Sequence, residues 1–251
     1  MIQIKSAREI SLMREAGKIA NEARAACARL VSPGVTTREL DAAARRIIEK
    51  YGATPSFLGY DGFPASICCS VNDEVIHGIP SNRKLCEGDV VKVDVGAFYM
   101  GYHGDCAASF AVGAVHDDAH KLIEVTKQSF YEGLKFALKD GRISGISRAI
   151  QAYNESYGYS VVRDFIGHGI GAELHEAPEV PNYFSGTRGA RLVPGMTLAI
   201  EPMVNQGAWQ VTRKPDGWGI VTADGSLSAH YEETILITEQ GPELLTVGDY
   251  E

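Results

Sequence analysis

The chain repeats itself, because groups that occur in its first half recur in the same order in its second half. Residues 85–94 read LCEGDVVKVD and residues 192–201 read LVPGMTLAIE, with leucine, glycine, apolar and acidic positions in register. The pattern His-x-acid at 103–105 recurs at 230–232, and His-Gly-Ile at 77–79 recurs at 168–170. Each fragment alone could arise by chance, but three in the same order point to two halves of similar fold.

The pattern of apolar residues predicts two helices followed by strands in each half. Capping boxes that begin at Ser6 and Thr36 mark the starts of the first two helices. Alternating valines at 91–95 predict a strand, and a return strand runs to about residue 112. The second half predicts helices over about 117–139 and about 144–158, followed by strands. The interval from His168 to Glu201 is longer than the matching interval from His77 to Asp94. The second half therefore carries an insertion, which contains His175.

Length and composition limit the classes to which the protein can belong. A chain of 251 residues allows one large domain or two small ones. The 24 basic and 32 acidic residues give a formal net charge of −8, which argues against a nucleic-acid binder. No apolar run approaches the ~18 residues of a membrane span, and the first ten residues lack the apolar core of a signal peptide. An odd set of five cysteines without C-x-x-C spacing suits a reducing compartment, so we expect a cytoplasmic protein.

Four acidic residues interrupt or follow apolar strand patterns: Asp94, Asp105, Glu201 and Glu232. An ionised carboxylate on such a strand is costly to bury unless it is paired or bound to a metal, and four acids together repel one another. If the halves meet about a pseudo-twofold axis, these acids converge, and His168 adds a nitrogen ligand. Such an oxygen-rich set favours Mn, Fe(II), Co or Zn in a two-metal hydrolytic site.

Other histidines have simpler explanations. We expect His103 and His230 to be structural and to point off the face of their neighbouring acids. The histidines at 116 and 120 lack the glutamate of a zincin motif, so a surface helix that begins there, capped by Asp117 or Asp118, is the better interpretation.

Several longer motifs resemble those of type I methionine aminopeptidases of the minimal bacterial kind. They are SVNDEVIHGIP at 70–80, DVG at 94–96, GYHGD at 101–105, GHGIG at 167–171, HEAP at 175–178, IEPM at 200–203 and YEET at 231–234. The resemblance spans nearly the whole chain. It implies the pita-bread fold, a duplicated α+β fold in which helices cover a curved antiparallel sheet. It also implies a single catalytic domain over 1–251, with pseudo-symmetric halves at about 1–114 and 115–251.

The resemblance implies a role for each residue at a matching position. Glu201 is implied to transfer protons, and His77 and His175 to contact substrate and stabilise the tetrahedral intermediate. From the repeat alone His77 would be a metal ligand like His168, but the family places it near the scissile bond, and we follow the family. Asp105 and Glu232 are implied to bridge two divalent ions. The full set of implied ligands is Asp94, Asp105, His168, Glu201 and Glu232.

The same resemblance implies a pocket for the methionine side chain, since aromatic and thiol surfaces suit a flexible thioether. Two positions depart from the commonest form of the family. Phe57 stands where a smaller residue is common, and Leu174 stands where an aromatic residue is common. Asn72 and Ser228 match positions implied to help hold one monovalent cation. The residues implied to line the pocket are Tyr60, Phe63, Cys68, His77 and Trp218.

These observations predict a metal-dependent aminopeptidase that removes the initiator methionine from new polypeptides when the second residue is small. Its partners would be N-terminal Met peptides and nascent chains near the ribosome, with no nucleic acid and no membrane, and a monomer is the expected state. One alternative is an X-Pro aminopeptidase or prolidase of the same fold, although those enzymes normally carry a further N-terminal domain. A second alternative is a peptide-binding protein that has kept the fold but lost the chemistry.

Overall fold

The computed structural model describes residues 2–246. Its helices are α1 (Ala7–Leu30), α2 (Thr37–Lys50), α3 (Asp117–Leu134) and α4 (Ile143–Ser156), with a short 3-10 helix at Tyr60–Gly62. Its strands are β1 (Thr54–Pro55), β2 (Cys68–Val71), β3 (Glu74–Ile76), β4 (Val90–Tyr99), β5 (Tyr102–Ala111), β6 (Ser160–Val161), β7 (Gly167–Gly169), β8 (Glu176–Val180), β9 (Thr197–Ile200), β10 (Met203–Asn205), β11 (Val211–Arg213), β12 (Ile220–Thr222), β13 (Ser228–His230), β14 (Glu232–Ile237) and β15 (Pro242–Leu244).

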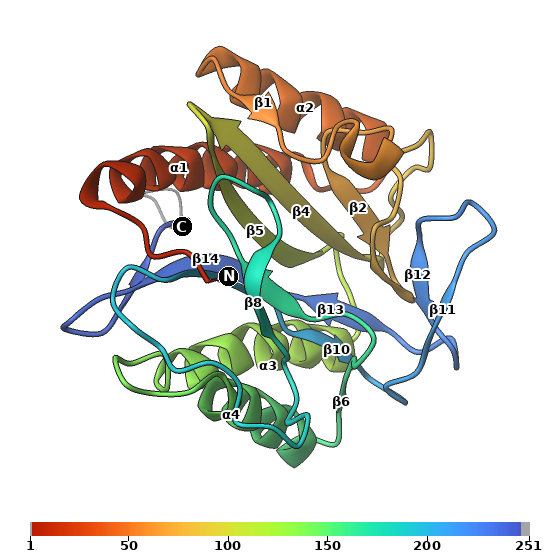
Figure 1. Cartoon of the computed structure of the whole chain (residues 1–251). Helices are drawn as coiled ribbons and strands as arrows, with labels where there is room; N and C mark the ends of the chain where they lie inside the picture. Colours follow the sequence, from red (N-terminus) through yellow and green to blue (C-terminus); the bar gives the residue numbers. More distant parts are fainter. Residues whose placement is uncertain (1, 247–251) are drawn as a thin grey trace.

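One curved antiparallel sheet joins the two halves of the chain (Figure 1). Its strand order is β1-β4-β5-β14-β9-β7-β8, with β2 also on β4 and β15 on β14. The central pair, β5 and β14, joins the halves, because Ala107 is in register with Glu232 and Cys106 with Glu233. Outside this pair lie β4 on one side and β9 on the other, which are the two strands that the sequence repeat aligns.

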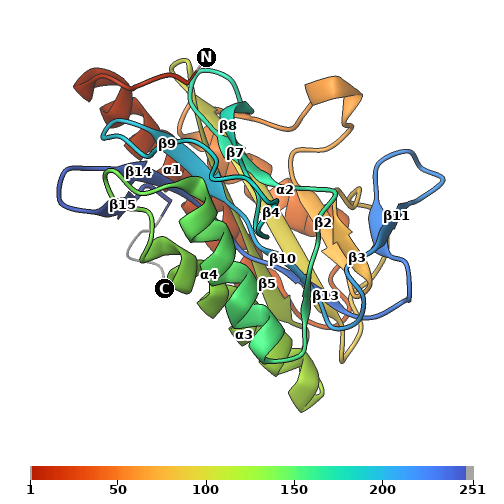
Figure 2. The same ribbon diagram turned by 60° about the horizontal axis from the view of Figure 1, so that its bottom comes forward.

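Each half covers the sheet with its own pair of helices. In Figures 1 and 2, α1 and α2 lie over one end of the sheet and α3 and α4 over the other. A buried apolar cluster from residues between 19 and 112 lies in the first half, and another from residues between 130 and 237 lies mainly in the second. Alternation along β4 explains the first cluster, because Val91, Val93 and Val95 all face α1 and α2 and are fully buried.

Helix starts follow the sequence more closely than helix ends. The capping boxes at Ser6 and Thr36 are both present, which confirms the predicted starts of α1 and α2. Helix α3 ends at Leu134 rather than near 139, because the segment after it forms tight turns and then binds residues 190–192 through backbone hydrogen bonds. The N-cap of α3 is His116, whose Nδ1 accepts from the backbone N–H of Asp118 at 3.3 Å, so the prediction of an aspartate cap is wrong.

Two small three-stranded sheets lie beside the large sheet, and the first of them packs against α3 and α4. One has the strand order β13-β10-β6 and the other β11-β12-β3. Strand β13 contacts β3, β4 and β5, so residues from both halves meet there. Among residues 2–246 no helix combines the length and apolar character that crossing a bilayer requires.

Candidate metal centre

The four acids and His168 come from strands on both sides of the β5–β14 junction. Because successive side chains of a strand face opposite ways, the acids point away from the apolar clusters under the helices. All five side chains line one cavity of about 230 Å³. The residues and their positions are Asp94 in β4, Asp105 in β5, His168 in β7, Glu201 directly after β9, and Glu232 at the start of β14.

Three of these side chains lie close enough to share one ion. Asp105, His168 and Glu232 each offer a ligand atom, and these atoms lie within 4.8 Å of one another. The Nε2 atom of His168 lies 3.5 Å from a carboxylate oxygen of Glu201. Because His168 Nδ1 donates to the carbonyl oxygen of Gly169 at 2.9 Å, Nε2 is left with a lone pair directed at the acids.

Burial raises the pKa of every acid of this group, and repulsion from another acid adds to the shift at Asp94, Glu201 and Glu232. Burial raises the pKa of Asp105 to about 7. Burial, together with the charge of Asp105, raises the pKa of Asp94 and of Glu232 well above the usual range. Burial and the charge of Asp94 do the same to Glu201. Burial also lowers the pKa of His168, to about 3, so its ring is neutral and able to bind a metal.

A divalent cation fits this arrangement. One carboxylate oxygen each of Asp94, Asp105 and Glu232 is buried without a hydrogen-bond donor among the described residues. Such oxygens are costly to bury unless a positive charge compensates them. Oxygen ligands with a single imidazole suit the divalent metals of hydrolytic sites, and the lack of thiolate ligands separates the group from structural zinc sites.

The residues predicted to hold the methionine side chain line the same cavity. Tyr60, Phe63, Cys68 and Trp218 all border it. Phe63 and Trp218 meet edge to face with their ring centroids 5.1 Å apart, a favourable aromatic arrangement. Burial raises the pKa of Cys68 well above its usual range, so Cys68 is a neutral thiol that presents an apolar surface.

Two further histidines border the cavity beside the acids. The rings of His175 and His168 lie edge to face, with centroids 4.4 Å apart, and the Tyr60 hydroxyl hydrogen-bonds to His175 Nδ1 at 2.7 Å. Burial lowers the pKa of His77 to about 4, and it also lowers the pKa of His175. His77 has a φ of 58°, a backbone conformation uncommon for residues other than glycine, so β3 ends in a strained turn that presents this ring to the cavity.

Three more side chains border the cavity besides the predicted set: Phe57, Leu174 and Asp61. Phe57 and Leu174 are 8% and 2% exposed and belong to an apolar cluster shared by both halves. Asp61 was not predicted from the sequence. Its φ of 48° marks a strained position, and the only sequence signal is the flanking Tyr-Asp-Gly turn composition.

His103 and His230 have different surroundings. His103 Nδ1 hydrogen-bonds to the hydroxyl of Ser56 at 2.8 Å. The expectation that His230 points away from the acids is wrong, because its Nε2 lies 3.8 Å from a carboxylate oxygen of Glu201. His230 and Glu232 are two residues apart on extended chain, and such residues share a face.

Asn72 and Ser228 lie next to each other, although they are far apart in sequence. The backbone N–H of Ser228 donates to the carbonyl oxygen of Asn72 at 3.1 Å. The ammonium of Lys92 donates to the same oxygen at 2.7 Å. The Asn72 carbonyl oxygen thus accepts from two groups of the protein, the backbone N–H of Ser228 and the amino group of Lys92.

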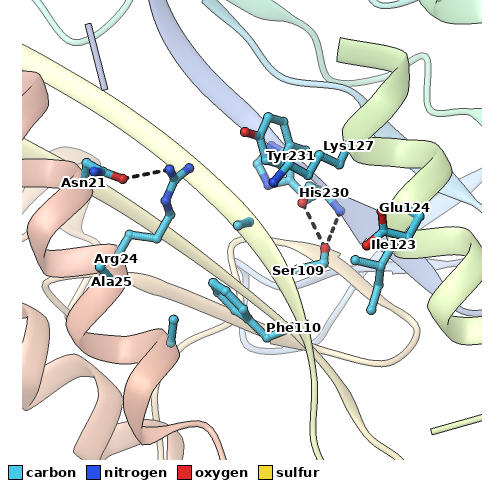
Figure 3. Close-up of a pocket in the computed structure, with 12 residues that line it drawn as sticks. Asn21, Arg24, Ala25, Ser109, Phe110, Ile123, Glu124, Lys127, His230 and Tyr231 are labelled. Carbon is cyan, nitrogen blue, oxygen red and sulfur yellow. Dashed lines mark hydrogen bonds between the residues drawn. The ribbon is translucent and has the colours of Figure 1, made fainter. Parts of the chain in front are cut away.

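A buried ion pair supports the centre from the helix side of the sheet. Arg24 of α1 pairs with Glu233 at 2.9 Å and donates to the backbone carbonyl of Ala107, at 3.2 Å, and to that of Glu232, at 3.3 Å. Arg24 also donates to the side-chain oxygen of Asn21 at 2.9 Å (Figure 3). Both residues line a second cavity, of about 330 Å³, between α1 and α3. This support was not predicted from the sequence, since the partners are 209 residues apart.

Comparisons with known proteins agree over nearly the whole chain. The profile of metallopeptidase family M24 matches residues 11–239. A methionine aminopeptidase of Clostridium acetobutylicum is 55% identical over 248 residues, which are 98% of this chain and 99% of that protein. Methionine aminopeptidase 1 of Bacillus subtilis is 50% identical over 246 residues, again 98% and 99% of the two chains.

Solved structures show the same fold. The crystal structure of a methionine aminopeptidase from Thermotoga maritima has a TM-score of 0.96 at 45% identity and covers 99% of this chain and 100% of that chain. The prolidase from Pyrococcus furiosus has a TM-score of 0.79 at 24% identity and covers 98% of this chain and 66% of that chain. At that identity the prolidase likeness concerns the fold alone. These matches confirm the pita-bread fold and the family resemblance of the motifs, and the chain belongs to metallopeptidase family M24.

Proposed function

We propose that this protein is a metal-dependent aminopeptidase that removes the N-terminal methionine from polypeptides whose second residue is small. The observation that carries this proposal is where the proposed metal-binding group lies, namely the four acids with His168. Its five side chains share one cavity with an apolar pocket of aromatic rings and a neutral thiol. Relatives named methionine aminopeptidase, at 42–55% identity over nearly the full length, support it.

Two divalent ions are the proposed cofactors. Divalent metal, when bound, would polarise both the attacking water and the scissile carbonyl. Four separate carboxylates and one neutral imidazole supply enough ligand atoms for two such ions, and Asp105 and Glu232 are the residues that would contact both. Oxygen-rich sites discriminate poorly among metals by affinity alone, so Co, Mn, Fe(II) and Zn all remain candidates. The five proposed ligands are Asp94, Asp105, His168, Glu201 and Glu232.

The proton transfers are assigned to Glu201. Its carboxylate borders the cavity beside His168, where it would take a proton from water and return it to the leaving amine. His168 and His230 lie 3.5 and 3.8 Å from its two carboxylate oxygens and limit its movement.

His77 and His175 are assigned to the substrate. Since both rings have lowered pKa values, they are neutral near pH 7 and each presents one N–H donor. When the Tyr60 hydroxyl donates to His175 Nδ1, the ring proton is on Nε2. A donor held in this way can stabilise negative charge that develops on the carbonyl oxygen.

The substrate side of the proposal follows from the shape and composition of the pocket. Tyr60, Phe63, Cys68 and Trp218 would surround one unbranched thioether side chain. Newly made polypeptides that begin with methionine are the proposed substrates, including chains that are still near the ribosome, and we propose a cytoplasmic monomer.

Release of methionine from the peptide Met-Ala-Ser tests this function. We expect hydrolysis with added Mn or Co, loss of hydrolysis after chelation and recovery when metal is restored. Full activity after rigorous metal removal would refute the chemistry. A parallel panel of X-Pro peptides tests the prolidase alternative, which predicts faster hydrolysis of X-Pro bonds. Asp105→Ala tests the non-catalytic alternative, since a protein that only binds peptides would keep its function after this change.

A further inference from the structure

Lys92 is a buried lysine that the proposed chemistry does not use. Its side chain is only 1% exposed, and it is among the largest fully buried side chains of the described residues. Its ammonium donates to the backbone carbonyl oxygen of Asn72 at 2.7 Å. A buried ammonium is costly unless it has close acceptors, so this contact is part of how the chain folds at that point.

The acceptor belongs to a turn that several strands share. Asn72 has a φ of 58°, a conformation uncommon for residues other than glycine. Its side chain accepts from the backbone N–H of Val90 at 2.9 Å and donates to Asp89 at 2.8 Å. Its carbonyl oxygen also accepts from the backbone N–H of Ser228 at 3.1 Å. Lys92 therefore ties β4 to the turn after β2 and, through the shared carbonyl oxygen, to β13.

These three segments each lead to a residue of the active-site cavity. Lys92 is two residues before Asp94 on β4, so the two side chains share a face. The turn at Asn72 continues through β3 to His77, and β13 continues to Glu232. The junction at Lys92 thus sets how the first-half and second-half residues of the cavity meet.

The Asn72 carbonyl oxygen has no capacity left for another cation. A carbonyl oxygen has two lone pairs, and here Lys92 Nζ and the N–H of Ser228 use both. The Asn72 side-chain amide is also occupied, because its oxygen accepts from Val90 and its nitrogen donates to Asp89. The Ser228 hydroxyl donates to the carbonyl oxygen of Val204 at 3.2 Å. An ammonium group and a potassium ion carry the same charge and are similar in size, so one can stand in place of the other.

We propose that the Lys92 ammonium is a built-in monovalent cation, which holds the Asn72 turn against β4 and β13 so that this protein needs no Na⁺ or K⁺ there. Lys92 is a positioning residue. The proposal goes beyond the proposed function, and depends on it only where hydrolysis is the readout.

The first test uses the unaltered protein. Thermal unfolding of the metal-free protein is compared in KCl, NaCl and choline chloride at equal ionic strength. We expect the same midpoint in all three salts, because choline is too large for a site between backbone groups. A midpoint that is higher specifically in KCl or NaCl would overturn the proposal.

The second test removes the internal cation. Lys92→Ala leaves room beside the Asn72 carbonyl oxygen, and we expect K⁺, Na⁺ or NH₄⁺ to raise its unfolding midpoint by several degrees over choline. The matched control is Lys214→Ala. Lys214 pairs at 2.5 Å with Glu74, which follows the Asn72 turn, but the Lys214 side chain is 36% exposed. The control should respond equally to all salts. Equal instability of Lys92→Ala in every salt would contradict the proposal.

Hydrolysis gives a second readout. In Lys92→Ala loaded with Mn, we expect Met-Ala-Ser hydrolysis to be at least a few-fold faster in KCl than in choline chloride. If no variant hydrolyses the peptide, the proposed function fails, while the unfolding midpoints still decide the role of Lys92.

Discussion

The guanidinium of Arg24 donates a hydrogen bond to the backbone carbonyl of Glu232 at 3.3 Å, so helix α1 holds this acid from the opposite side of the sheet. The side chains of Glu232 and Glu233 point to opposite faces of β14, one to the cavity and the other to Arg24. The buried pair of Arg24 and Glu233 therefore aligns the centre without contacting substrate.

Arg24→Met should be strongly destabilising. It leaves Glu233 buried without its partner, and breaking a buried pair in this way costs about 3–5 kcal/mol. Urea unfolding of the metal-free protein measures the loss. Arg14→Met is the control, because Arg14 pairs with Glu243 at an exposed site where such pairs contribute about 0–1 kcal/mol. Equal effects of the two changes would show that Arg24 has no special role.

Asp105→Asn should separate metal binding from stability. It removes a proposed bridging ligand, so we expect metal affinity to fall more than about 100-fold, a loss larger than that from changes around a metal site. The metal-free variant should be more stable than the parent by roughly 1–3 kcal/mol at pH 7.5, because a buried carboxylate oxygen without a hydrogen-bond donor is gone. Calorimetric titration with Mn and thermal unfolding test the two halves of this prediction. If metal-free Asp105→Asn were less stable than the metal-free parent, the carboxylate of Asp105 would not destabilise the folded protein as proposed.

The two tryptophans provide a matched test of the pocket. Trp218 borders the cavity and packs against Phe63, whereas Trp209 contacts Arg163 outside it. Trp218→Ala should lower kcat/KM for Met-Ala-Ser about tenfold, which corresponds to ~1.4 kcal/mol of lost apolar contact. Trp209→Ala should leave kcat/KM nearly unchanged. A larger effect at Trp209 would place the methionine side chain elsewhere.

Glu9 makes stability depend on pH at the start of α1. Hydrogen bonds from Ser6, and one from Tyr102, lower the pKa of Glu9 to about 2. A lowered pKa in the folded state contributes stability above the unfolded value of about 4.3 that is lost as pH falls toward 2. The difference in unfolding midpoint between the parent and Glu9→Gln should therefore shrink from pH 5 to pH 2. Glu15→Gln, an exposed change on the same helix, is the control for the substitution itself.

The central part of the site was predictable from the sequence because its signal is local. An acid at the end of an apolar strand is costly, and the same cost appears in both halves, so Asp94 and Glu201 could be paired from their sequence contexts alone. The contact of Arg24 with Glu233 has no such signal, since the partners lie 209 residues apart on a helix and a strand.

Lys92 shows where periodicity misleads. Its place in the alternation of valines is typical of a residue that faces solvent, yet it is 1% exposed, because β13 contacts β4 and the Asn72 turn accepts a hydrogen bond from its amino group. Helix α3 stops early for a similar reason, since contacts with residues 190–192 replace its last turn. Tertiary contacts decided both outcomes, and local sequence does not encode them.

Anomalous diffraction from crystals soaked in Mn tests the central claim most directly. Two peaks are expected, both within bonding distance of the side chains of Asp94, Asp105, His168, Glu201 and Glu232, and neither should appear in Asp105→Asn. Manganese bound elsewhere, with these five side chains unliganded, would contradict the account.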